Sequence, residues 1–301
     1  MNPSNQIVPG LQDNQSEFND PFFKRFQLRT AAEPLALNEQ ISKDYLFPTL
    51  YGNVSCAIGV FLCNRDKAQA LLPHSKMKPV AMPGGKALVT FSCYEYKQVL
   101  GIAPYNEIAM TIPVMIDPMV NVPVLPMLIQ KFKRFGYYVF HMPVTSKENR
   151  IRGQKIWGLP KQVETINIGI DGDTSTTEAI DAAGNHYFSL KVPTCGKKQL
   201  FDVQSNLYSR LGDQLLQSTT CFNGTFSVNK FTDRLWRNGG DDPGVLSFGE
   251  GPYGDMLRAL EIEPQPFQFR YTPSMNACFD LPNPDYCAPF DFIGRPEEVT
   301  A

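Results

Sequence analysis

Residues 87–94, with the sequence ALVTFSCY, carry the signal that decides the fold. Valine, threonine, phenylalanine and tyrosine favour extended backbone, because branched and aromatic side chains pack well on a pleated sheet. A similar composition recurs at residues 57–62, 137–142 and 267–271. These four segments predict that the core of the protein is a β-sheet.

A second group of strands is predicted at residues 165–192. Ile166, Ile168 and Ile170 alternate with polar or small neighbours before a turn at residues 171–173. Another turn, Gly184-Asn185, precedes a strand-like run at residues 186–192. Alternating strands joined by short turns are typical of an antiparallel meander.

Helical spacing is clearest in two segments. Residues 65–72 form the first, which ends at Pro73, and residues 124–135 form the second, which ends at Gly136. The 25 prolines fit short strands joined by rigid turns better than a helical bundle. The expected fold is α+β, mainly antiparallel β, with a curved or closed sheet and two or three helices on its surface.

The composition favours a small-molecule ligand. Twenty-eight Lys and Arg against 30 Asp and Glu give a net charge of -2, so no general attraction to nucleic acid or to acidic membranes is expected. The most apolar stretch, residues 108–129, contains four prolines and Asp117 and is not a membrane span. The first residues, MNPSNQ, do not resemble a secretory signal, so we expect a cytoplasmic protein.

The chain is expected to hold one main domain. Residues 1–44 begin with a polar stretch and are predicted to form an extended or partly disordered arm. Residues 45–290 contain no linker, charge block or repeat and form the predicted domain, and residues 291–301 form a tail.

Several common sites have no support in the sequence. The seven cysteines contain no CxxC pair, which argues against a zinc knuckle and a disulfide framework. Residues 249–254 (GEGPYG) match GxGxxG, but Pro252 removes a backbone donor, so we interpret them as a surface turn. Of the three histidines, His141 lies in an apolar strand and is interpreted as a core or pocket-wall residue.

Lys161 is the unusual residue. It follows Pro160 in a stretch that is otherwise apolar or small, between Trp157 and the strand that contains Ile166. Burial would disfavour its charged form, lower its pKa and leave more neutral amine to attack a carbonyl. The alternative is a lysine whose stem packs while its tip reaches water.

A family resemblance favours the first interpretation. Residues 152–162 (RGQKIWGLPKQ) resemble the active-site stretch of acetoacetate decarboxylases, in which an aromatic-rich run ends in Pro-Lys-Lys. Lys161 falls on the Schiff-base lysine of that stretch. Residues 105–114 (YNEIAMTIPV) resemble the Tyr-x-Glu strand of the family, which supplies an active-site carboxylate at Glu107. The likeness extends from about Tyr45 to Pro284.

The resemblance implies a decarboxylase-like curved sheet or cone-shaped barrel and a keto acid or ketone as substrate. Lys161 and Glu107 would be the catalytic residues, in a reaction that needs no cofactor and no metal. The family is commonly oligomeric, so a homo-oligomer is expected. Five neighbours of the catalytic pair would contact the substrate: Tyr105, Gln162, Trp157, Leu159 and Met142.

The sequence also departs from the family pattern. Gln162 stands where the decarboxylases have a second lysine, so burial would have to lower the pKa of Lys161. The early-strand arginine aligns with residues 52–54, which contain no cation, and a strand carboxylate is replaced by Ser92, unless Glu95 takes that place. These differences favour a substrate other than acetoacetate.

Three functions are consistent with this pattern. The first is decarboxylation of a β-keto acid through an enamine, and the second is aldol condensation and dehydration of a 2-oxo acid with an aldehyde through the same imine. The third is a non-catalytic binding protein on the same fold. Imine chemistry requires Lys161 to face Glu107 inside an apolar cavity. A separate hypothesis gives the N-terminal arm a role in assembly.

Overall fold

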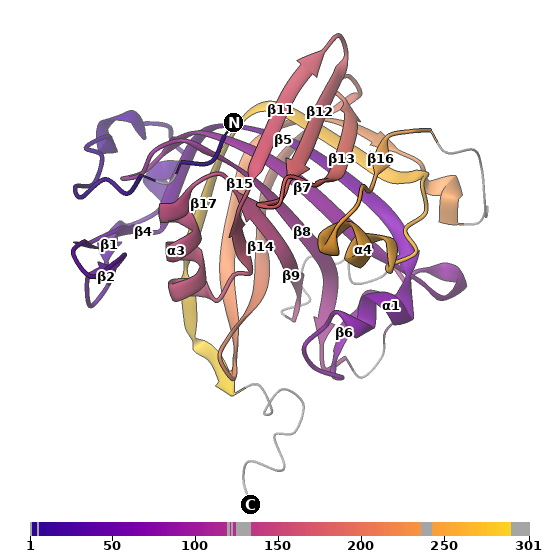
Figure 1. Cartoon of the computed structure of the whole chain (residues 1–301), viewed down its shortest axis with the longest axis horizontal. Helices are drawn as coiled ribbons and strands as arrows, with labels where there is room; N and C mark the ends of the chain where they lie inside the picture. The colour runs from indigo at the N-terminus through magenta and orange to yellow at the C-terminus, as the bar shows by residue number, and fades with distance from the viewer. Residues whose placement is uncertain are drawn as a thin grey trace, which may run out of the picture.

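Seven strands of the computed structural model close into a mixed barrel (Figure 1). The structure describes residues 2–4, 6–118, 121, 123–124, 134–235 and 243–289. Around the barrel, the strand order is β9-β14-β15-β17-β5-β7-β8, and β8 pairs with β9 to close it. Their bounds are β5 (Thr49–Asn64), β7 (Lys86–Val99), β8 (Tyr105–Ile116), β9 (Phe135–Val144), β14 (Lys197–Leu211), β15 (Gln214–Lys230) and β17 (Pro266–Pro289).

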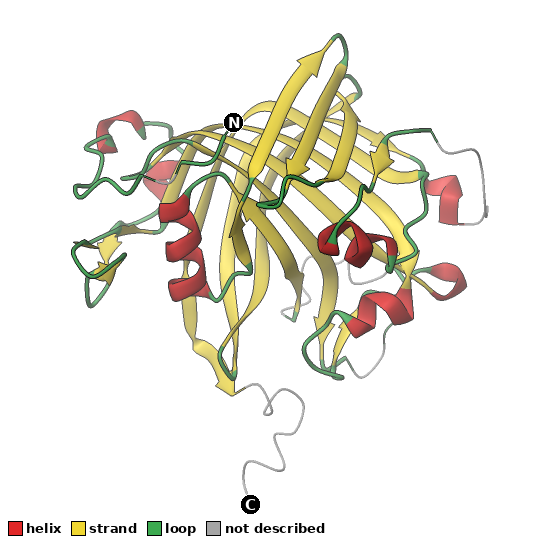
Figure 2. Ribbon diagram, in the orientation of Figure 1, coloured by secondary structure: helices red, strands yellow, loops and turns green. Residues whose placement is uncertain are grey.

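Only one neighbouring pair in the closed barrel, β9 with β14, is parallel, and the others are antiparallel. The predicted fold class is therefore confirmed. The four segments that predicted a sheet lie in β5, β7, β9 and β17. Figure 2 shows how far strands dominate over helices.

Two short strands extend the barrel. Strand β6 (Met77–Pro79) pairs with β8, and β10 (Lys161–Val163) lies parallel to β9. A second, four-stranded sheet packs beside the barrel, with the order β11 (Thr165–Asp171), β12 (Thr174–Ile180), β13 (His186–Pro193) and β16 (Leu246–Ser247). All its pairs are antiparallel, as the predicted meander requires.

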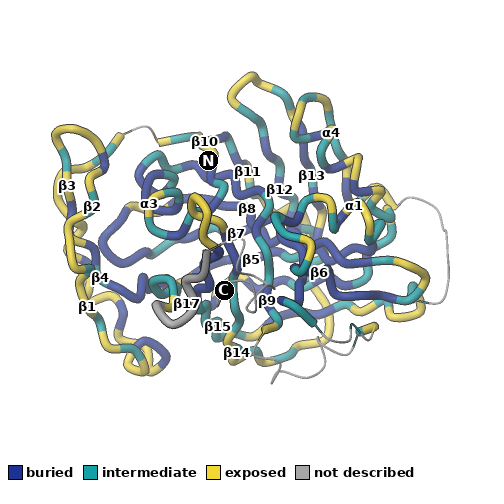
Figure 3. Tube along the Cα trace, turned by 90° about the horizontal axis from the view of Figure 1, so that it is seen from below, coloured by how far each residue is buried: buried dark blue, intermediate teal, exposed yellow. Residues whose placement is uncertain are grey.

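One hydrophobic cluster joins the two sheets. Phe61 and Phe91 of the barrel pack with Phe188 and Leu190 of β13, and all four are buried. Figure 3 shows that burial follows the barrel strands, while exposed residues gather around β2 (Leu35–Ala36) and β3 (Ser42–Lys43). This apolar layer on the outer side of β5 and β7 leaves their inner side free to line a cavity.

Helices lie on the outside of the barrel. Those in the described residues are α1 (Arg65–Ala70), α3 (Lys147–Trp157) and α4 (Pro252–Arg258), and short 3-10 turns occur at η1 (Gln15–Glu17), η2 (Phe23–Arg25), η3 (Pro83–Gly85) and η4 (Thr232–Leu235). Helix α1 was predicted, whereas α3 and α4 were not. Residues 252–254, interpreted as part of a surface turn, begin α4, since proline is well tolerated in the first helical turn. Most of the helix predicted at 124–135 lies outside the described residues, and Phe135 belongs to β9.

The N-terminal segment is more closely packed than an extended or partly disordered arm. Phe18, Phe22 and Phe23 are buried in a cluster that includes Leu50 of β5. Its described residues also form strand β1 (Arg29–Thr30), which pairs with β4 (Leu46–Phe47). The expected boundary at residue 45 stays a prediction, and the expected tail, residues 291–301, lies outside the described residues.

In the part of the chain that is described, no helix combines the length and the apolar character needed to cross a bilayer.

Candidate active site

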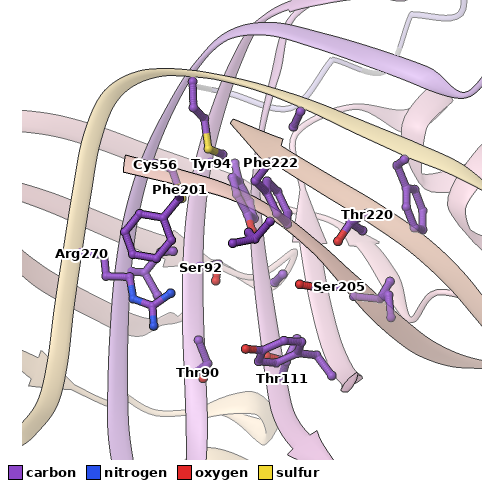
Figure 4. A pocket seen from close by; sticks show the side chains of 18 of the residues that line it. Cys56, Thr90, Ser92, Tyr94, Thr111, Phe201, Ser205, Thr220, Phe222 and Arg270 are labelled. Carbon is purple, nitrogen blue, oxygen red and sulfur yellow. The ribbon is translucent and has the colours of Figure 1, made fainter. Parts of the chain in front are cut away.

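The barrel encloses a cavity of about 560 Å³. Its walls follow the two-residue period of the strands, because alternate side chains of a strand point to the same face. Strand β8 contributes Glu107, Ala109, Thr111 and Pro113, and β7 contributes Thr90, Ser92, Tyr94 and Tyr96. Figure 4 shows several of these side chains projecting from neighbouring strands into the same space.

Helix α3 and strand β10 deliver Lys161 to this cavity. The helix begins after Ser146, whose side chain accepts a hydrogen bond from the Asn149 N–H, and ends at Gly158 in the left-handed region (φ 60°). A Cβ at Gly158 would overlap the Arg210 carbonyl, so this tight reversal needs glycine. The chain then pairs with β9, with Lys161 opposite Met142.

Lys161 is buried, with an exposed fraction of 5%. Its Nζ donates to Oε2 of Glu107 at 2.6 Å and to Oδ1 of Asn149. The lysine stem passes directly over Gly153 of α3, which has no side chain to obstruct it. The amine is thus held at the cavity wall and is largely withdrawn from bulk water.

Glu107 projects into the cavity from β8. Strand β8 pairs with one edge of β9, and β10, which carries Lys161, pairs with the other edge. Glu107 is paired with Tyr94 in the β7–β8 register, and its exposed fraction is 5%. Its second oxygen, Oε1, accepts a hydrogen bond from the Tyr96 hydroxyl at 3.3 Å. The carboxyl group can therefore exchange a proton with the amine on one side and with a phenol on the other.

Burial lowers the pKa of Lys161, because the charged ammonium loses its hydration. The carboxylate of Glu107 opposes this shift, and the positive charge of Arg152 adds to it. Arg152 projects from α3 with an exposed fraction of only 1%; its Nη2 donates to the Thr49 hydroxyl at 3.0 Å, and its guanidinium lies 4.2 Å from the Tyr45 ring centre. A cation thus acts on Lys161 although Gln162 replaces the second lysine of the family.

The predicted substrate contacts divide into two groups. Met142 and Leu159 line the cavity together with Lys161 and Glu107. Gln162 is exposed, because the next residue of a strand points to the opposite face, and the geometry does not place it at the cavity.

Two other predicted contacts are buried next to the cavity without lining it. Trp157 packs between Phe47 and Phe279, and its indole donates to the Asp280 carbonyl at 2.8 Å. Tyr105 is buried with its ring centre 5.8 Å from the Lys161 Nζ. Both support the site by packing and do not appear among the lining residues.

The other two differences from the family pattern, at the strand carboxylate and at the early-strand arginine, can also be located in the structure. Ser92 lines the cavity, whereas Glu95 lies outside the lining and pairs with Lys97 at 3.4 Å. Ser92 is therefore the residue at the site. Residues 52–54 lie on β5 and supply no cation, as the sequence indicated.

A family model for acetoacetate decarboxylase matches residues 32–206. The chain belongs to the acetoacetate decarboxylase family. A sequence search of curated proteins finds no match.

Solved structures of other proteins share this fold. An acetoacetate decarboxylase from Legionella pneumophila superposes with a TM-score of 0.55, at 15% identity over 91% of this chain and 94% of its own. Another acetoacetate decarboxylase gives 0.53, at 12% identity over 78% and 87%. The enduracididine biosynthesis enzyme MppR, solved with pyruvate, gives 0.50, at 13% identity over 83% and 96%. At these identities the likeness shows the fold alone.

Proposed function

We propose that this protein is a Schiff-base-forming lyase that decarboxylates a β-keto acid through Lys161. The observation that carries the proposal is the buried Lys161 amine, 2.6 Å from Glu107 at the wall of the barrel cavity. Burial of an amine costs free energy, and this buried amine also faces a cavity that can hold a ligand. A buried amine of lowered pKa is suited to nucleophilic attack.

The first stage forms the imine. The neutral Nζ of Lys161 attacks the substrate carbonyl to give a carbinolamine, and a proton moves from nitrogen to oxygen. Loss of water and protonation of nitrogen then give an iminium ion. Glu107 lies within hydrogen-bond reach of Nζ, so it can carry these protons.

The second stage breaks the carbon–carbon bond. The electron pair of the bond to the carboxylate flows toward the iminium nitrogen, carbon dioxide leaves and an enamine remains. The enamine carbon takes a proton, and water hydrolyses the iminium to release the ketone and the free lysine. The enamine replaces a higher-energy enolate, which is the catalytic advantage of the imine.

Acetoacetate itself does not fit the site well. Residues 52–54 offer no cation to its carboxylate, and Ser92 replaces a family carboxylate. The cavity of about 560 Å³ is also within the range of pockets that hold ligands much larger than a four-carbon acid. The proposed substrate is therefore larger than acetoacetate.

Aldol condensation followed by dehydration is a second candidate. Lys161 and Glu107 would serve it equally well, and MppR has been solved with the condensation product of pyruvate and imidazole 4-carboxaldehyde. Cytoplasmic location and assembly into a homo-oligomer stay predictions from the sequence.

Product analysis tests the proposal. The protein is incubated with a series of β-keto acids of increasing chain length, and carbon dioxide release above the spontaneous rate is measured beside Lys161→Gln. Release by the wild type alone supports decarboxylation. No release, together with an unsaturated product from pyruvate and an aldehyde, would move the assignment to the aldolase-dehydratase.

A further inference from the structure

The charged groups around the cavity are unbalanced. Among the described residues that line it, only four carry charge: Glu107, Lys161, Lys230 and Arg270. Glu107 and Lys161 face each other and compensate one another. The remaining positive charges of Lys230 and Arg270 have no acidic counterpart on the cavity wall that the structure describes.

Arg270 is held by neutral groups. Its Nε and Nη2 donate to Oε1 of Gln268 at 3.0 and 2.7 Å, and its guanidinium lies 5.0 Å from the centre of the Phe201 ring. Within the described part of the chain it forms no ion pair with a carboxylate. These contacts fix the plane of the guanidinium, while leaving donors available, because the group has about five N–H donors in all.

Figure 4 shows the Arg270 side chain projecting from β17 into the pocket, toward the side where Thr90 and Ser92 lie. These hydroxyl groups come from β7, two strands away from β17 in the barrel order. They face the same cavity as Arg270 across Ile58 of the intervening strand β5, and Phe222 is among the apolar residues on the other walls.

Arg270 is separate from the Lys161 end, and Ser92 lies between the two along the sheet. Arg270 aligns through Ile58 with Ser92, whereas Glu107 aligns with Tyr94, two residues further along the same strand. Three strand spacings also separate β17 from β8. The backbones of Arg270 and Glu107 are therefore on the order of 15 Å apart on a flat sheet, and the barrel curvature shortens that path.

We propose that Arg270, supported by Thr90 and Ser92, binds a carboxylate at the end of the substrate remote from the imine carbon. This inference rests on the proposed function and specifies its substrate class. The substrate is an oxo acid with a carboxylate several bonds beyond the carbonyl. For decarboxylation it is a 3-oxo dicarboxylic acid, which loses one carboxylate as carbon dioxide at Lys161 and keeps the other at Arg270.

The test separates this subsite from imine chemistry by using ligands without a carbonyl group. Octanoate and 1-octanol have the same chain, but only octanoate carries a carboxylate. Calorimetry compares their dissociation constants for the wild type, Lys161→Gln, Arg270→Gln and Arg270→Lys. We expect a preference for octanoate in the wild type and in Lys161→Gln, reduced by about tenfold in Arg270→Gln and partly kept in Arg270→Lys.

A second variant covers the possibility that Arg270→Gln fails to fold. Gln268→Glu supplies Arg270 with a carboxylate partner and should also reduce the preference for octanoate, with 1-octanol unaffected. Arg25→Met, at an exposed ion pair with Asp202, is the control and should change neither constant.

Three results would overturn the proposed carboxylate subsite. The wild type could show no preference for octanoate, the preference could be unchanged in both Arg270→Gln and Gln268→Glu, or Lys161→Gln could abolish it. None of them depends on whether Lys161 forms an imine. Conversely, a preference for octanoate would survive the failure of the proposed imine chemistry.

Discussion

Gly153 lies against the stem of Lys161, so that a Cβ at this position would overlap the lysine Cδ and lie 2.6 Å from its Cε. Helix α3 and strand β10 can place the amine beside Glu107 only because this helix position carries no side chain. A methyl group here would have to displace either the lysine or the helix.

Gly153→Ala is therefore expected to move the amine and reduce imine formation. The imine can be measured by reducing it with borohydride, which fixes the ligand covalently on Lys161. We predict that the rate of this trapping falls by about tenfold or more, because a small displacement of a reacting group is costly. Gly169→Ala is the matched control, since nothing lies within 4 Å of a Cβ built there. Equal trapping rates for the two variants would show that the close contact has no role in positioning Lys161.

Arg152 is predicted to help keep Lys161 neutral. Removal of its positive charge in Arg152→Met should raise the pKa of Lys161, so the pH profile of trapping moves to higher pH and the rate near neutrality falls. A rise of one pH unit in the midpoint would correspond to about a tenfold lower fraction of neutral amine. Arg152→Lys keeps the charge and should restore the profile. An unchanged midpoint in Arg152→Met would show that Arg152 does not contribute and that burial alone lowers the pKa of Lys161.

Glu107→Gln should have the opposite effect on the pKa. The carboxylate stabilises the ammonium, so its loss lowers the pKa of Lys161 further and shifts the trapping profile to lower pH. Turnover should nevertheless fall by about 10² to 10⁴, because the proton relay is lost. The two measurements are made on the same preparation. Full turnover in Glu107→Gln would remove Glu107 from the mechanism.

A buried polar cluster lies between β9, β13 and the segment after β10. The Tyr187 hydroxyl donates to Oε2 of Glu164 at 2.6 Å and contacts Nε2 of His141 at 3.2 Å. Burial raises the pKa of Glu164 to about 7 and lowers the pKa of His141 to about 4. His141 is thus a core residue with polar partners, one of the two interpretations that the sequence left open.

This cluster predicts a pH-dependent stability. The native pKa of Glu164 lies above its ordinary value of 4.5, so the folded protein binds an extra proton between about pH 4.5 and 7. The contribution of Glu164 to the free energy of unfolding is therefore present in full at low pH and is lost as the pH rises through 7. The difference in free energy of unfolding between wild type and Glu164→Gln should therefore shift by up to about 3 kcal/mol in favour of the wild type on acidification.

Chemical denaturation at several pH values measures this difference. Nε2 of His141 lies 3.7 Å from Oε1 of Glu164, so the comparison is also made in a His141→Gln background, where that histidine does not titrate. Glu250→Gln, at an exposed position, is the control. A difference that does not vary with pH, or that favours the wild type more at high pH, would contradict the raised pKa of Glu164.

Much of the barrel could be predicted from local sequence, and the exceptions have physical causes. Strands rich in branched and aromatic residues, such as residues 87–94, were predicted because they face the core on one side and the cavity on the other. The hairpin of β14 and β15 was missed because its alternating polar residues give a weak signal, and Leu200 is 73% exposed. Helix α3 was missed because it is rich in polar residues, although Ser146 before it and Gly158 after it are typical helix-end residues.

The site was predicted only where a short motif carried it. Lys161 and Glu107 belong to segments that resemble the family. Arg152 lies in the same segment as Lys161, but its effect on the pKa of Lys161 was not predicted. The burial of Arg152 depends on Tyr45 and on Thr49, which lies 103 positions earlier in the chain, and no local pattern reports such a contact. Arg270 was missed for the same reason, since its place on the cavity wall follows from barrel closure.

The imine itself provides the most direct measurement. The protein is incubated with pyruvate or with β-keto acids of increasing chain length, reduced with borohydride, and examined by intact mass and peptide mapping. Lys161→Gln is the catalytic control, and Lys43→Met is a second control, because Lys43 is also buried beside a carboxylate, 2.8 Å from Glu148, but lies outside the cavity lining. The proposed function predicts one reduced imine adduct on Lys161 in the wild type and in Lys43→Met, and none in Lys161→Gln. Its mass is that of the ligand minus water plus two hydrogens, less carbon dioxide where decarboxylation precedes reduction. No addition to the wild type, or equal addition to Lys161→Gln, would contradict it.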